Sequence, residues 1–131
     1  MTMLFPDVEA WAVTHLETAL AARPESYASN VHVGTAVPEP RVDRMVVVRR
    51  DGGGQTGIFD NARLSWRVWA GTEADASDLA RLVGALLWAA PDGNPVVRVT
   101  HESGPSRVID DSRQPQRLAL TTIRTRGEQL S

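Results

Sequence analysis

The chain has 131 residues, a formal net charge of −2 at pH 7 and no cysteine. Its length predicts one domain, residues 1–131, with a hydrophobic core. The slight negative charge argues against a general polyanion binder. The lack of cysteine excludes disulfides, thiolate nucleophiles and cysteine-based metal sites. All 14 basic residues are arginine.

The N-terminal residues do not form a cationic stretch followed by an apolar run, so we expect no signal peptide. No run approaches the roughly 18 apolar residues that a membrane span needs. We therefore expect a soluble protein that is made or assembled inside the cell, without a membrane partner.

A first helix is expected after Pro6 and Asp7, and Arg23 followed by Pro24 ends it. His15 is expected on its solvated side. The apolar stripe of this helix consists of Val8, Trp11 or Ala12, Leu16, Ala19 and Leu20.

Strands are expected at residues 30–37 and 42–50, separated by Pro38 and Pro40. A glycine cluster at residues 51–57 follows. It is not a phosphate-binding loop, because the chain has no lysine and the cluster leads into a strand instead of a helix. We expect a flexible hairpin connection there.

The next strand, residues 60–69, alternates between two faces. Leu64, Trp66 and Val68 form an apolar face. Arg63, Ser65, Arg67 and Trp69 form the opposite one. This pattern predicts a strand with one face in the core.

The period then changes to that of an amphipathic helix, which Pro91, Gly93 and Pro95 close. Thr72 is the expected N-cap, with Asp75 three residues later. The apolar stripe consists of Leu79, Leu82, Val83 and Leu86.

Residues 96–102 predict a strand, and residues 102–105 a turn that leads to a short partner strand at 105–110. After a loop at 111–115, residues 117–126 form the last long strand. Arg124 and Arg126 share one of its faces. Residues 127–131 are expected to fray.

The expected order is α-β-β-β-α-β-β-β. Hairpin-linked strands and two helices of similar length predict an α+β fold, a mainly antiparallel sheet with both helices packed on one face.

No catalytic, cofactor-binding or metal site is expected. His15, His32 and His101 lie on three different elements without ligand spacing. Asp110 and Asp111 lie in a polar loop, where turn formation explains them.

An association surface is the better candidate. Tryptophan and arginine are enriched at association surfaces, and Trp88 either folds over the end of its helix or anchors a partner. The candidate interface residues are Arg63, Arg67, Trp69, Trp88, Arg124 and Arg126.

Four segments, residues 60–70, 76–87, 102–118 and 121–127, resemble the tail-terminator proteins of long-tailed bacteriophages that infect high-GC actinobacterial hosts. The part from Gly104-Pro105 to Pro115 and Arg117 is the most telling. Gln116, between Pro115 and Arg117, is a small departure from the family pattern.

The resemblance implies a non-enzymatic virion protein of the tail or neck, assembled in the host cytoplasm. Such proteins form a hexameric ring on the finished tail tube, stop its polymerisation and present a surface to the head-tail connector. The implied partners are other copies of the chain, the tube protein and the connector or stopper, and genomic DNA only passes through the lumen. The alternatives are another neck component, such as a stopper or adaptor, and a small enzyme or ligand-binding domain.

Overall fold

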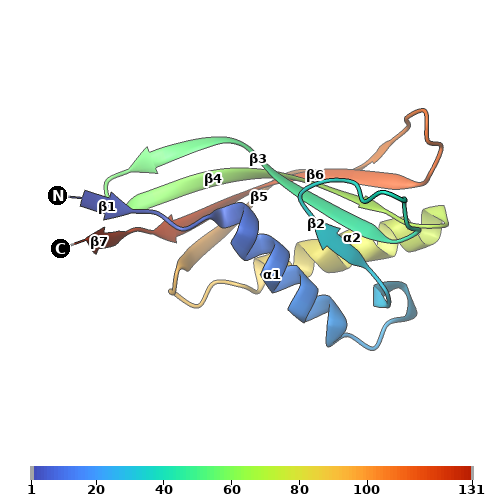
Figure 1. The fold of residues 1–131 in the computed structure, drawn as a ribbon, viewed down its shortest axis with the longest axis horizontal. Coiled ribbons are helices and arrows are strands. Elements are labelled where there is room, and N and C mark those ends of the chain that lie inside the picture. Colours follow the sequence, from blue (N-terminus) through green and yellow to red (C-terminus); the bar gives the residue numbers. More distant parts are fainter. Residues whose placement is uncertain (1, 131) are drawn as a thin grey trace.

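The computed structural model describes residues 2–130. It has two layers (Figure 1), a five-stranded sheet and a helical layer on one of its faces. The helices are α1 (Val8–Ala21) and α2 (Glu73–Trp88). This arrangement confirms the expected α+β class. Neither helix is long and apolar enough to cross a membrane.

The main sheet has the strand order β2-β3-β4-β6-β5. All neighbouring strands are antiparallel except β2 and β3, which are parallel. The bounds are β2 (His32–Gly34), β3 (Met45–Thr56), β4 (Phe59–Trp69), β5 (Val96–Val108) and β6 (Gln116–Arg126). A short 3-10 helix, η1 (Ser26–Ala28), precedes β2.

Both helices start at the residues that the sequence indicates. The Asp7 side chain accepts a hydrogen bond from the Ala10 N–H at 3.1 Å, and Thr72 Oγ1 accepts one from the Asp75 N–H at the same distance. Each bond satisfies a backbone donor that the first helical turn leaves free.

The core lies between the helices and the sheet. Leu64, Trp66 and Val68 of β4 are fully buried there, as their alternation predicts. Trp66 Nε1 donates a hydrogen bond to Thr121 Oγ1 of β6 at 2.9 Å, so the largest core side chain leaves no polar atom unpaired. On α1 the buried residue of the Trp11–Ala12 pair is Ala12.

The glycine cluster is strand, which corrects the expected flexible connection. β3 continues to Thr56, and only Gly57 and Ile58 connect it to β4. A register shift lies between Arg50 and Gly52. This shift is a β-bulge, and regular pairing of β3 with β4 resumes beyond it at Gly52.

Residues 96–110 do not form a hairpin of their own. β5 is one strand, and it pairs with β6 along its whole length. Register shifts on either side of Ser103 accommodate Gly104, which has a φ of 83°. The expected turn is therefore a set of bulges, because the long strand β6 offers a partner that keeps the chain extended.

The chain ends are also ordered differently from expectation. Glu128–Leu130 forms β7, which pairs antiparallel with β1 (Thr2–Leu4) in a second, two-stranded sheet. The predicted frayed tail is thus wrong for these residues, and Ser131 lies outside the described residues. The predicted strand 30–37 is shortened to His32–Gly34.

Candidate assembly surface

The strand pairing places six arginines on the face of the sheet opposite the helices. Residues directly opposite each other in antiparallel strands point to the same face. In β4, Arg63 and Asn61 point away from the core, opposite to Leu64 and Trp66. Arg124 is paired with Asn61 and therefore lies on the same outer face. We call the following set the arginine face: Arg49, Arg63, Arg67, Arg98, Arg124 and Arg126.

The structure thus brings four predicted interface residues together: Arg63, Arg67, Arg124 and Arg126. Arg49 and Arg98 also lie on this face, but they were not among the interface residues predicted from the sequence. Arg49 pairs with Ser65, and Arg98 pairs with Arg124. Their alternation within residues 42–50 and 96–102 was visible in the sequence, but the pairing that places them beside the other four was not.

Positive charge on the arginine face is mostly unpaired. Arg63 Nε lies 2.8 Å from Asp51 Oδ1, and this hydrogen bond raises the pKa of the arginine. Within residues 2–130, no carboxylate oxygen lies within 4.0 Å of the other five guanidinium groups. Three of the five, Arg49, Arg67 and Arg124, donate hydrogen bonds to neutral acceptors instead. For example, Arg124 Nε donates to Asn61 Oδ1 at 2.8 Å.

Phe59 adds to this surface at one end. The Arg124 guanidinium carbon lies 4.8 Å from the centroid of its ring, and that of Arg126 lies 6.0 Å away. Such contacts hold arginine heads close to an aromatic face. The surface therefore presents positioned guanidinium groups, which suit bidentate contacts with acidic partners.

Trp69 is a predicted interface residue, but it does not belong to the exposed surface of the chain. It is 3% exposed and packs with Met45 and Val47 in a small cluster on the arginine side. Two connecting segments cover this end of the sheet, since Gln114 Nε2 donates to the Asp43 carbonyl at 2.8 Å. Gln114 and Asp43 are 71 residues apart, so the alternation of side chains along one strand could not predict that these segments bury Trp69.

Trp88 is exposed, so it does not fold over the end of its helix, and its role as an anchor for a partner stays a prediction. It is the last residue of α2, with 66% of its surface accessible. It lines a cavity of about 290 Å³ with Arg81, His101 and Pro105 among others. Trp88 therefore lies in the helical layer, on a surface separate from the arginine face.

The other sequence candidates have structural roles. His15 is partly buried, not solvated as expected. Its ring stacks on Trp11 at 5.0 Å, and its Nε2 lies 3.0 Å from the Leu86 carbonyl oxygen. Among residues 2–130, no group of three or more His, Asp or Glu side chains is arranged to hold a metal ion.

Asp110 orders its own loop. Its carboxylate accepts hydrogen bonds from Ser112 and Gln116, and these bonds, chiefly the one from Ser112, lower the pKa of the carboxyl group.

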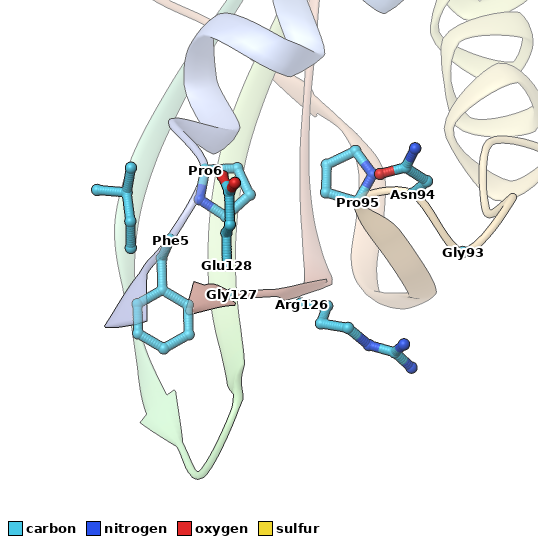
Figure 2. A pocket seen from close by; sticks show the side chains of 9 residues that line it. Phe5, Pro6, Gly93, Asn94, Pro95, Arg126, Gly127 and Glu128 are labelled. Atoms are coloured by element: carbon cyan, nitrogen blue, oxygen red, sulfur yellow. The ribbon is translucent and has the colours of Figure 1, made fainter. Parts of the chain in front are cut away.

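A cavity of about 520 Å³ lies where the chain ends meet the main sheet (Figure 2). Pro6 and Pro95 lie on two sides of it, and Arg126 and Glu128 are its charged lining residues. Neither of these charged groups is accompanied by a nucleophile or a metal-binding cluster. The lining therefore gives no indication of a catalytic or metal-binding site.

No family model matches the sequence, and no curated protein matches it. Among solved structures, the chain is similar to a chain of the virion of a native gene transfer agent particle, with a TM-score of 0.67 and 17% identity over 93% of this chain and 100% of that one. It also matches the structure of the bacteriophage SPP1 gp17 protein, with a TM-score of 0.45 and 18% identity over 92% and 96% of the two chains. The first match establishes a common fold over nearly the whole chain.

Proposed function

We propose that this chain is a structural protein in the tail or neck of a phage-like virion, and that it is a tail terminator. The observation that carries the proposal is the full-length fold match to a chain of a gene transfer agent virion. The resemblance of residues 60–70 and 102–118 to tail terminators supports the specific role. A catalytic function has no support in the arrangement of side chains.

In this proposal, copies of the chain form a closed ring, a hexamer by analogy with the family, on the end of the tail tube. A ring needs two different contact patches on each subunit. The arginine face and the separate surface around Trp88 are the two we propose. The ring contacts the tube protein on one side and the head-tail connector on the other, and DNA passes through its lumen.

Deletion of the gene from its phage tests the role. A terminator limits the growth of the tube, so we expect tails of uncontrolled length in electron micrographs. Complementation with the wild-type gene should restore one length. Tails of normal length that fail to attach to heads would contradict the terminator role and indicate a stopper or adaptor.

A further inference from the structure

A third cavity, of about 470 Å³, opens on the arginine side of the sheet near Trp69. We call it the Trp69 cavity. Strand residues form its floor, and residues of the connecting segments form its sides. Its lining consists of Val37, Arg41, Val47, Arg49, Arg50, Asp51, Ser65, Arg67, Trp69 and Asp110.

Three guanidinium groups in this lining are bound only to neutral acceptors. Arg41 Nη2 donates to Gln114 Oε1 at 3.1 Å, Arg49 Nε to the Thr35 carbonyl at 3.0 Å, and Arg67 Nη1 to Gln116 Oε1 at 3.3 Å. A guanidinium group has five N–H donors, so each keeps several free. The fourth arginine, Arg50, is held by Asp60.

The indole N–H of Trp69 is a further donor without an acceptor. Trp69 is 3% exposed, and its Nε1 has no hydrogen-bond partner within the described residues. A buried tryptophan N–H usually finds one. The Arg41 guanidinium lies over this ring, 5.8 Å from its centroid, and it extends from an exposed connecting segment. The indole is thus a donor that the described residues leave unused.

The carboxylates in the lining are already occupied. Asp51 pairs with Arg63, and Asp110 accepts hydrogen bonds from Ser112 and Gln116. Donors therefore exceed acceptors in the cavity, which is the condition for binding an anion.

We propose that the Trp69 cavity binds the carboxylate of an aspartate or glutamate side chain from a second protein chain. A carboxylate matches the planar fork of Arg49 or Arg67 and accepts from the indole N–H. A DNA backbone fits less well, because the chain as a whole carries a net charge of −2, which disfavours a polyanion. The inference stands independently of the ring, since any acidic protein partner would satisfy the site.

The test uses the full chain labelled with ¹⁵N. Four tryptophans give four indole signals, and Trp69→Phe assigns the relevant one. A short capped peptide of alternating glutamate and glycine is titrated at low salt, beside the same peptide with glutamine. We expect the glutamate peptide alone to shift the Trp69 signal in a saturable way.

Arg49→Gln and Arg67→Gln should each weaken this binding by about tenfold, as the loss of a charge-assisted hydrogen bond does. Arg41→Gln repeats the test without altering a strand. Arg98→Gln, on the same face outside the cavity lining, is the matched control and should bind normally.

Equal shifts with both peptides, no shift with either, or unchanged binding by the three cavity variants would overturn the proposal. A short DNA duplex forms the other arm. A saturable Trp69 shift with the duplex and none with the glutamate peptide would assign the site to phosphate instead. Because the assay needs no ring, its failure is distinct from failure of the terminator role.

Discussion

At the scale of single residues, the core formed by residues 2–130 contains one buried carboxylate, that of Asp60. Its side chain is 1% exposed, and it accepts two hydrogen bonds from Arg50, at 2.6 and 2.8 Å. This contact raises the pKa of Arg50. A buried carboxylate persists in a fold only when such a partner compensates for its lost hydration.

Asp60→Asn should lower the free energy of unfolding by about 1.5–3 kcal/mol, because a charge-assisted pair is lost while Arg50 stays partly buried. Urea denaturation measures the change. Asp51→Asn is the control, since its pair with Arg63 is largely exposed and should contribute much less than the buried pair. Equal effects of the two variants would contradict the role of burial.

Trp66→Ala should lower the free energy of unfolding by about 3–5 kcal/mol, as large-to-small changes in a core do. Trp66 is fully buried, and its replacement also removes the hydrogen bond to Thr121. Thermal or urea denaturation checks the value. Trp88→Ala, at an exposed position, should change stability by no more than about 0.5 kcal/mol.

At the scale of elements, the hairpin of β3 and β4 depends on one glycine. Gly53 has a φ of 87°, and a Cβ placed on it would lie 1.8 Å from the Asn61 carbonyl oxygen of β4. The neighbouring Gly54 faces open space. The hairpin therefore needs glycine at position 53, just beyond the bulge, and tolerates other residues at 54.

Gly53→Ala should destabilise the hairpin by at least about 1 kcal/mol, since both the backbone conformation and the contact with β4 become unfavourable. Amide hydrogen exchange in β3 and β4 reports the opening of the hairpin. In the Gly54→Ala variant, the amides of β3 and β4 should exchange as slowly as in the wild type. Faster exchange in the second variant alone would contradict the requirement for glycine at position 53.

At the scale of the whole molecule, charge is distributed unevenly. The chain as a whole is slightly acidic, yet one layer presents six arginines, five of them without a carboxylate partner among residues 2–130. The remaining surface is correspondingly acidic. Such an asymmetry favours contacts between unlike faces of neighbouring molecules, as a ring requires.

Arg67→Glu should leave the monomer folded and weaken assembly, because its side chain is exposed and lies in the middle of the arginine face. Circular dichroism checks the fold, and native mass spectrometry in the presence of the tube protein checks assembly. Arg23→Glu, in the connection after α1, is the control for a change of charge. Normal assembly of the first variant would remove the arginine face from the proposed interface.

The sequence by itself determined the features that depend on near neighbours. The caps at Asp7 and Thr72 and the alternation of Leu64, Trp66 and Val68 each require only residues within a few positions, so periodicity predicts them. The same patterns led to the correct fold class.

The tertiary structure alone decided everything that depends on distant residues. Trp69 is buried because two remote segments meet over it, residues 96–108 form one strand because β6 extends beside them, and residues 128–130 are ordered because the N-terminal strand reaches them. The arginine face likewise forms through the register of four strands. A pattern along the chain sets the face on which a side chain lies, whereas only the pairing of strands decides what lies beside it.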